Sequence, residues 1–323
     1  MGELKVPTIG IKDVKIGNAQ NLDGLTGVTV IICEKGAVAG VDIRGGAPGT
    51  RETDLLDPIN TVDKVHAIVL SGGSAFGLEA SCGVMKYLEE KEFGFDVGVA
   101  KVPIVCQAVL FDLYLGSHLT RPNKEMGYSA SINANSEFEV GNIGAGTGAS
   151  IGKIKGMDFA MKSGLGYYEY KDDTGLIVGA IVAVNAFGDV IKDGSIIAGA
   201  LNDEKDGFAN SSNLLLNFQE DRKFSNTNTT IGAIITNAVL NKSQCKKVSQ
   251  VAHNGYARAI SPIHTSLDGD TIFTLSTGEI ECSADKISHI ASLTMEKAIH
   301  NAIYKSGSLG DLKSWGCLNS KKI

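Results

Sequence analysis

The sequence predicts a layered α/β or α+β sandwich. Short β-rich segments alternate with turns in the first third of the chain, and two long amphipathic segments lie in the last third. Between them, residues 176–184 form a nearly continuous apolar run, which is typical of a strand in a sheet covered on both faces. The 323 residues are enough for two average domains or for one large multilayer domain.

The first third is expected to contain three strands and one helix. The strands are predicted at residues 28–32, 37–43 and 66–70. Glu34-Lys35-Gly36 is predicted to be the turn of a hairpin formed by the first two strands. A helix is expected over residues 75–90, where apolar residues recur at helical spacing, with Ser74 as its N-cap.

The later elements surround a change in composition. After the 176–184 strand and its Asn185–Asp189 turn, residues 202–228 are polar and charged, as in an exposed connecting loop. A buried-strand pattern then resumes abruptly at Thr229. Helices are expected at 243–260 and 284–304, and a strand is expected between them at 271–275.

Composition excludes several classes of function. A formal net charge of −6 and the absence of a basic run argue against nucleic-acid and anionic-membrane partners. The longest uncharged apolar stretch is too short to span a bilayer, and the N-terminal residues have no apolar signal core. The six scattered cysteines contain no Cys-x-x-Cys pair, which favours buried free thiols over disulfides. A cytoplasmic protein is therefore expected.

The junction between the polar loop and the next strand offers a candidate nucleophile. The Thr229 hydroxyl could attack the carbonyl of Asn228 by an N-to-O acyl shift, and hydrolysis of the ester would release a Thr229 α-amine. With a reference pKa of roughly 7.7–8.0, that amine suits general-base catalysis on its own hydroxyl. The alternative is an ordinary β-branched strand residue. Asn228-Thr229-Thr230 also matches a glycosylation sequon, but glycosylation requires secretion.

Asp268-Gly269-Asp270 precedes the 271–275 strand. Residues two apart in an extended chain point to one face, so both carboxylates could converge on an ammonium, a hydroxyl or a metal. The alternative is a turn in which the aspartates cap the backbone. A metal is less attractive, because only His264 stands nearby and no ligand spacing is complete.

Two glycine-rich segments allow a nucleotide-binding interpretation. Gly144-Ala145-Gly146-Thr147-Gly148 approximates a dinucleotide fingerprint, but it lacks a clear strand before it and a helix after it. Ser71–Gly77 opens a helix but lacks the Lys-Ser/Thr ending of a P-loop. Its backbone N–H groups could still bind a substrate carboxylate. The histidines form no recognisable relay with a serine or cysteine motif.

Across nearly its whole length the chain resembles the self-processing aminopeptidases. That group includes L-aminopeptidase/D-amidase/D-esterases, β-peptidyl aminopeptidases and nylon-oligomer (aminohexanoate-oligomer) hydrolases. The resemblance rests on matching segments in the same order, at Thr26–Val30, Leu70–Leu78, Val102–Val105, Leu110–Leu113, Gly127–Tyr128, Gly144–Gly148, Met161–Gly166, Val182–Asn185, Asn228–Gly232 and His264–Thr271.

The resemblance implies roles for individual residues. Thr229 corresponds to the nucleophile, and Asn228 to the last residue of the N-terminal fragment. Asn185 corresponds to an oxyanion-hole asparagine, a donor typically worth roughly 3–4 kcal/mol of transition-state stabilisation. Tyr128 corresponds to a tyrosine that assists at the same place.

The remaining matches point to one branch of the family. Asp268 and Asp270 correspond to the pair that, in the nylon-oligomer hydrolases, orients the threonine hydroxyl and its α-ammonium. Lys162 falls where that branch has an active-site lysine, although Ser163 replaces the usual glycine and a solvated surface lysine is the alternative. Aminopeptidase members mostly combine a serine nucleophile with Ser-x-Glu. The resemblance therefore favours a broader amide hydrolase over a plain aminopeptidase.

The resemblance also implies a four-layer αββα sandwich of the α+β class, similar to N-terminal-nucleophile hydrolases. Residues 1–323 would form one domain, cut into associated fragments 1–228 and 229–323 that assemble into homo-oligomers, commonly tetramers. The expected activity is hydrolysis of small peptides, amino-acid amides or oligomers through an acyl-enzyme, with no cofactor and no metal. The alternatives are an acyltransferase similar to ornithine acetyltransferase and an unprocessed binding protein.

Overall fold

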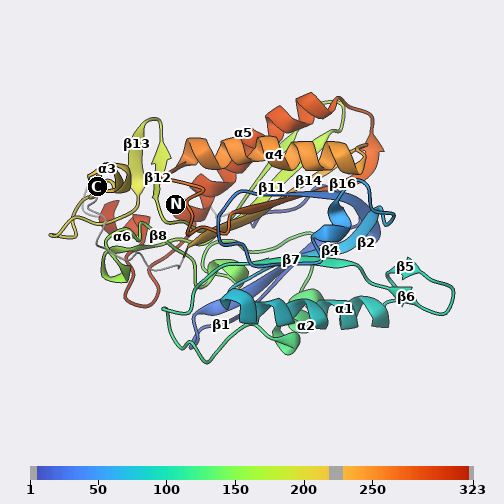
Figure 1. Cartoon of the computed structure of the whole chain (residues 1–323), viewed down its shortest axis with the longest axis horizontal. Helices are drawn as coiled ribbons and strands as arrows, with labels where there is room; N and C mark the ends of the chain where they lie inside the picture. The colour runs from blue at the N-terminus through green and yellow to red at the C-terminus, as the bar shows by residue number, and fades with distance from the viewer. Residues whose placement is uncertain (1–5, 218–227, 320–323) are drawn as a thin grey trace.

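The computed structural model describes residues 6–217 and 228–319, and a nine-stranded sheet forms its centre. Eight of the strands follow one path and the ninth, β1, pairs with β2. In path order they are β10 (Leu165–Lys171), β11 (Ile177–Asn185), β14 (Thr229–Ala238), β16 (Thr271–Ile280), β2 (Thr26–Ile43), β4 (Lys64–Ser71), β7 (Val105–Val109) and β3 (Thr50–Arg51), and β1 spans Val14–Asn21. Figure 1 shows these strands between two pairs of helices.

The long strand β2 connects two halves of this sheet. Residues 38–43 of β2 pair with β16, and residues 26–33 pair with β1. The sequence predicted two strands joined by a turn at Glu34–Gly36, and that prediction was wrong. The structure has one strand with a register shift between Ile32 and Ala37, because both flanking segments continue along β4. Gly36 provides the positive φ of 71° at this irregularity.

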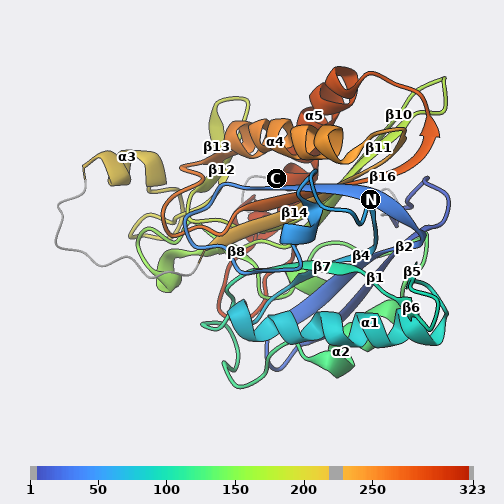
Figure 2. The ribbon, with the colours of Figure 1, turned by 45° about the vertical axis from the view of Figure 1, so that its right-hand side comes forward.

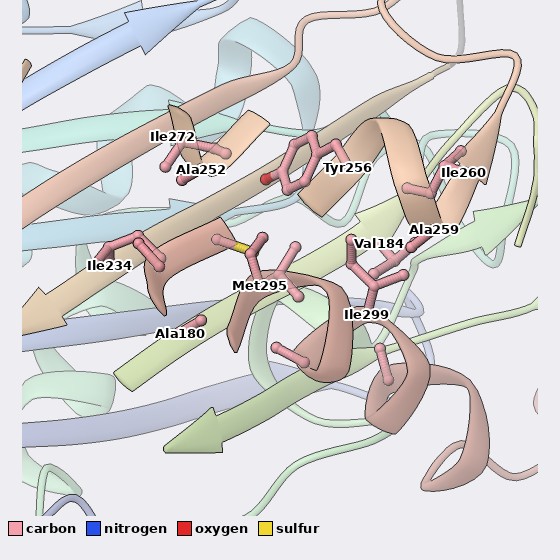
Figure 3. Close-up of a cluster of buried hydrophobic side chains, with 14 of the residues drawn as sticks. Ala180, Val184, Ile234, Ala252, Tyr256, Ala259, Ile260, Ile272, Met295 and Ile299 are labelled. Atoms are coloured by element: carbon pink, nitrogen blue, oxygen red, sulfur yellow. The ribbon is translucent and has the colours of Figure 1, made fainter. Parts of the chain in front are cut away.

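Three buried apolar clusters define four layers. Along β11, Val182 and Val184 face α4 (Lys242–Ala259) and α5 (Ala284–Tyr304), whereas Ile181 and Ala183 face the other half of the sheet. Helices also cover the outer face of the other half of the sheet, because Val30 packs in the cluster of α1 (Ala80–Glu90) and α2 (Lys124–Ile132). Figures 1 and 2 show the helix pairs on opposite sides of the strands, and Figure 3 shows the cluster beneath α4 and α5. The predicted αββα sandwich is confirmed.

The long helices follow their local sequence signals. Asn241 and Gln244 form a capping box at the start of α4, and Ser283 caps α5. The helix predicted over 75–90 begins instead as a 3₁₀ helix at Ser74–Glu79, followed by α1. Ser74 is not its N-cap, because Ser74 itself has a positive φ of 53° and no side-chain cap bond forms there.

Shorter helices and strands lie at the two ends of the sandwich. The predicted loop at 202–228 contains the short helix α3 (Ser211–Leu216), its residues 218–227 lie outside the described residues, and Asn228 is buried. No helix within the described ranges is long and apolar enough to cross a membrane. All six cysteines have free thiols, and Cys33, Cys106 and Cys245 are buried. The remaining elements are β5 (Phe95–Asp96), β6 (Lys101–Val102), β8 (Ser150–Ile151), β9 (Met161–Lys162), β12 (Asp189–Lys192), β13 (Ser195–Ala198), β15 (Ile260–Ser261) and α6 (Trp315–Asn319).

Candidate active site

Three neighbouring strands meet at the position predicted for the nucleophile. Thr229 is the first residue of β14 and lies directly opposite Asn185, the last residue of the antiparallel strand β11. On the other side, β16 runs parallel to β14, so the Asp268–Asp270 segment that precedes it lies at the same edge. Residues opposite one another across a sheet point to the same face. The Thr229 and Asn185 side chains therefore share the face that looks between the two halves of the sheet.

The Thr229 hydroxyl lies against the peptide carbonyl that precedes it. Its Oγ1 donates a hydrogen bond to the carbonyl oxygen of Asn228 and accepts one from the backbone N–H of Gly269 at 3.2 Å. Thr229 is 4% exposed, so bulk water has little access to this hydroxyl in the uncut chain. A Cβ at position 269 would stand 2.9 Å from Oγ1, so only glycine allows this close approach.

The carboxylate of Asp270 holds the backbone next to Thr229. Its Oδ1 accepts the N–H of Thr230 at 2.7 Å, and its Oδ2 accepts from the backbone N–H of His264 at 3.1 Å and from the His264 ring at 2.8 Å. Asp270 is fully buried. The side chain therefore joins the start of β14 to the loop before β16.

The described hydrogen bonds to the Asp268 carboxylate go to only one of its two oxygens. Its Oδ2 accepts hydrogen bonds from the N–H of Thr265 at 2.8 Å and from its hydroxyl at 2.6 Å. Its Oδ1 is buried and has no hydrogen-bond partner within the part of the chain that the structure describes. Burial, reinforced by the neighbouring charge of Asp270, raises the pKa of Asp268 above its usual range. The described partners of the Thr229 hydroxyl are backbone groups, not these carboxylates.

The side-chain amide of Asn185 is fixed from two sides. Its Oδ1 accepts from the N–H of Ser150 at 3.0 Å and from Nζ of Lys153 at 2.7 Å, while its Nδ2 donates to the carbonyl of Phe111 at 2.9 Å. Lys153 also donates to the Asn185 carbonyl at 3.0 Å. These contacts settle which end of the amide bears the N–H groups, because Oδ1 must face the ammonium.

Lys153 is a buried amine among acids. It is 4% exposed, and burial lowers its pKa to about 7, partly opposed by the charges of Asp268 and Asp112. Asp112 accepts from Thr26 Oγ1 and from the Gly73 N–H, both at 2.7 Å, and burial raises its pKa to about 6. Perturbed groups of opposite sign next to a buried hydroxyl are typical of catalytic sites.

Comparisons with known proteins identify the family of this chain. The model of Peptidase family S58 matches residues 7–313. The chain belongs to peptidase family S58. It is 42% identical over 294 residues to an uncharacterized aminopeptidase of Mycobacterium leprae, covering 85% of this chain and 79% of the relative. It is 34% identical over 280 residues to a 6-aminohexanoate-oligomer endohydrolase of Kocuria sp., covering 83% of this chain and 74% of the relative.

Solved structures share the fold at lower identity. A β-aminopeptidase of a Burkholderia species superimposes with a TM-score of 0.70 at 18% identity, over 96% of this chain and 91% of that chain. The L-aminopeptidase D-Ala-esterase/amidase of Ochrobactrum anthropi, described as a variant of the Ntn hydrolase fold, has a TM-score of 0.68 at 17% identity, over 93% and 89%. Family and relatives together make this S58 chain a hydrolase of peptide or amide bonds.

Of the residues predicted for the S58 site, the structure brings together Thr229, Asn228, Asn185, Asp268 and Asp270. It does not bring Tyr128 there. Tyr128 lies on α2 in an outer layer, its hydroxyl donates to Glu90 at 2.7 Å, and its ring packs edge-on against Tyr87. The expectation that Tyr128 assists Asn185 is corrected, because α2 turns this side chain toward α1 and the surface.

The lysine that contacts Asn185 is Lys153, and not Lys162 as predicted. Lys162 was predicted to be the active-site lysine, but the described bonds of its Nζ go to the backbone carbonyls of Gly146, Ala149 and Ser163. It is buried rather than a solvated surface lysine, and burial lowers its pKa to about 7. The lysine that reaches Asn185 is Lys153, which sequence reasoning missed. The segment Gly152–Gly156 contains two lysines, Lys153 and Lys155, and no sequence pattern marks Lys153 as the buried one.

Two further residues near the S58 site were also missed. Asp112 lies within the matched Leu110–Leu113 segment and Tyr114 directly follows it, so the resemblance contained a signal for them. Tyr114 is exposed and its ring lies 5.5 Å from that of Phe111, whose carbonyl holds Asn185. No group of three or more metal-ligating side chains occurs in residues 6–217 and 228–319.

Proposed function

We propose that the chain cuts itself between Asn228 and Thr229 and then hydrolyses amide bonds through an acyl-enzyme on Thr229. The observation that carries this proposal is the contact between the Thr229 hydroxyl and the Asn228 carbonyl, at a site flanked by Asn185 and the N–H of Gly269. A hydroxyl that already touches the bond to be cut needs little further movement, which favours intramolecular attack.

In the proposed maturation, the Thr229 oxygen attacks the carbonyl carbon of Asn228. The C–N bond breaks, the Thr229 nitrogen takes the hydroxyl proton and becomes the free amine, and an ester joins Asn228 to Oγ1. Water then hydrolyses this ester, which gives a carboxylate on Asn228 and restores the hydroxyl. The N–H of Gly269 lies within hydrogen-bond distance of Oγ1 and supports its orientation.

In the proposed turnover, the Thr229 α-amine accepts the hydroxyl proton as the oxygen attacks a substrate amide carbonyl. The Nδ2 of Asn185 donates to the developing oxyanion, and the α-ammonium protonates the leaving amine. Water then releases the acyl group. Oδ1 of Asp268 has no hydrogen-bond partner among the described residues, and this supports a role for the carboxylate in binding the α-ammonium, because a buried charge without a partner is costly.

The strand order supports association of the two fragments after the cut. The proposed C-terminal fragment supplies β14 and β16, and these strands are inserted between β11 and β2 of the proposed N-terminal fragment. Separation would expose the ladder hydrogen bonds on both sides and the apolar cluster that β14 shares with β11. We propose that these associated pairs assemble further into cytoplasmic homo-oligomers.

The proposed substrates are small peptides and amides or oligomers of amino acids, including β- and ω-amino acids. The relatives bear the names of an aminopeptidase and a 6-aminohexanoate-oligomer endohydrolase. The combination of Thr229 with Asp268 and Asp270 favours the broader amide hydrolase.

A panel of α-, β- and ω-amino-acid amides, incubated with the purified protein, tests this function. Release of amine from at least one class by wild type, and none by Thr229→Ala, is expected. An added amine acceptor separates hydrolysis from acyl transfer, because an acyltransferase would form a new amide instead of the acid. Equal activity of the Thr229→Ala variant, or no hydrolysis by a processed wild type, would overturn the proposal.

A further inference from the structure

The position of Thr230 depends on one buried carboxylate. Asp270 Oδ1 accepts the N–H of Thr230 at 2.7 Å, and Thr230 is the residue directly after the nucleophile. A displacement of this carboxylate would therefore move the start of β14, where errors of about 1 Å can cost roughly 100-fold in rate. Whatever fixes Asp270 also fixes Thr229.

His264 contacts the other oxygen of that carboxylate twice. Its backbone N–H lies 3.1 Å and its ring Nδ1 lies 2.8 Å from Asp270 Oδ2. His264 has a positive φ of 59°, a conformation that a residue with a Cβ adopts at a cost. In this conformation the main-chain and side-chain donors of one residue converge on one oxygen. Because an ionised carboxylate only accepts hydrogen bonds, Nδ1 must bear the proton.

Helix α4 holds the His264 ring in place. The Tyr256 ring stacks on it at a centroid distance of 6.1 Å, and the His253 ring meets it edge to face at 4.8 Å. His253 is anchored in turn through Nε2 to the Asp42 carbonyl at 3.1 Å. Burial lowers the pKa of His253 to about 3, so this ring is neutral and packs as an aromatic surface.

The contact between the two histidines is packing and not a proton path. Nε2 of His264 and Nδ1 of His253 are buried and have no hydrogen-bond partner in the described portion of the chain. The hydrogen-bonded chain therefore runs from Thr230 through Asp270 to His264 and ends there. An arrangement of this kind fixes a geometry without moving a proton.

We propose that His264 is a positioning residue for the nucleophile: through Nδ1 it holds Asp270 in the orientation that places Thr230 and hence Thr229 for attack. This inference rests on the proposed function of Thr229. It adds a residue outside the set Thr229, Asn185, Asp268 and Asp270, and it assigns Asp270 to backbone placement.

Three substitutions of His264 distinguish the loss of its hydrogen bond to Asp270 from the loss of side-chain volume. His264→Leu removes the donor and keeps much of the volume, His264→Asn keeps a donor near the position of Nδ1, and His264→Gln places its donor near Nε2. The matched control is His300→Leu, because the His300 ring also makes a hydrogen bond through one nitrogen, from Nε2 to the Ile191 carbonyl at 2.8 Å. Each variant is assayed for the fraction cut at 228/229 over time and for kcat and KM per cut molecule.

The inference predicts that His264→Leu lowers the cutting rate and kcat by roughly 10- to 100-fold, the value of one hydrogen bond to a charged group. KM should stay within about twofold, because the role assigned to His264 is to orient the nucleophile and not to bind substrate. His264→Asn should recover most of kcat and His264→Gln should not, while His300→Leu should keep the wild-type kcat. If His264→Leu does not fold, the comparison of His264→Asn with His264→Gln still decides.

Equal kcat for His264→Leu and wild type would overturn the inference, as would equal loss in His264→Asn and His264→Gln. The Thr229→Ala variant distinguishes a failure of this inference from a failure of the proposed function. A Thr229→Ala chain that is still cut or active contradicts the proposed function whatever the His264 variants do. An inert Thr229→Ala beside a fully active His264→Leu contradicts only the role of His264.

Discussion

Replacing Lys153 with methionine should change the pH dependence of stability in a defined direction. Burial lowers the pKa of Lys153 to about 7 from the usual lysine value of 10.5, so the folded chain disfavours the ammonium form relative to the unfolded chain. This cost is complete below the folded pKa, at about pH 7. It disappears as the pH rises through the unfolded value. Wild type should therefore gain stability relative to Lys153→Met as the solution becomes alkaline.

The size of the gain follows from the two pKa values. Between about pH 8 and about pH 9.5, linkage gives a gain of roughly 2 kcal/mol for the lysine over the methionine chain. Lys153 is 4% exposed, so solvent screening reduces this value little. Asp112 and Asp268 titrate below this window, since their raised pKa values remain on its acid side. The comparison thus isolates Lys153.

Urea unfolding measures this difference best in a chain that stays in one piece. Thr229→Ala lacks the hydroxyl that the proposed cut requires, so Thr229→Ala and Thr229→Ala/Lys153→Met can be compared as single chains. In the Thr229 background, Lys153→Met should also lower kcat, because the Asn185 amide loses one of the donors that orient it, Nζ of Lys153. A stability difference that stays constant within about 0.5 kcal/mol over the pH window would refute the buried, low-pKa lysine.

Three other substitutions give separate outcomes. Asn185→Ala should lower kcat by roughly 100- to 1,000-fold, the usual cost of losing one oxyanion donor, and a loss below about tenfold would contradict that role. Gly269→Ala should slow cutting and turnover because its Cβ would meet Thr229 Oγ1 at 2.9 Å, whereas Gly307→Ala, with open space around it, should behave as wild type in both assays. Tyr128→Phe should leave kcat unchanged, and a tenfold loss of about 1.4 kcal/mol in kcat/KM would return Tyr128 to the site.

Local signals explain which parts of the fold were predictable. The start and end of α5 were predicted at residues 284 and 304, because apolar residues recur at helical spacing between them. Strand β2 was missed as one element, because Gly36 looks like a hairpin turn. Only the pairing with β4, which lies far along the chain, shows that the strand continues.

The candidate site also has parts that the sequence predicts and parts that depend on the folded chain. The residues around Thr229 allowed both a nucleophile and an ordinary strand residue, and the family resemblance favoured the nucleophile. The register that sets Asn185 opposite Thr229 is a property of the folded sheet. The burial of Lys153 could not be predicted from the sequence, because it arises from contacts with Asn185, more than thirty residues further along the chain. Tyr128 matched the family segment, but its helix lies in an outer layer.

The mass of the denatured, purified protein shows directly whether the chain is cut at Thr229. Wild type should give two fragments, one ending at Asn228 and one beginning at Thr229 with a free α-amine. Thr229→Ala should give a single uncut chain. A wild-type chain that stays intact yet hydrolyses amides, or a Thr229→Ala chain cut at the same bond, would contradict Thr229 as the self-cleaving nucleophile.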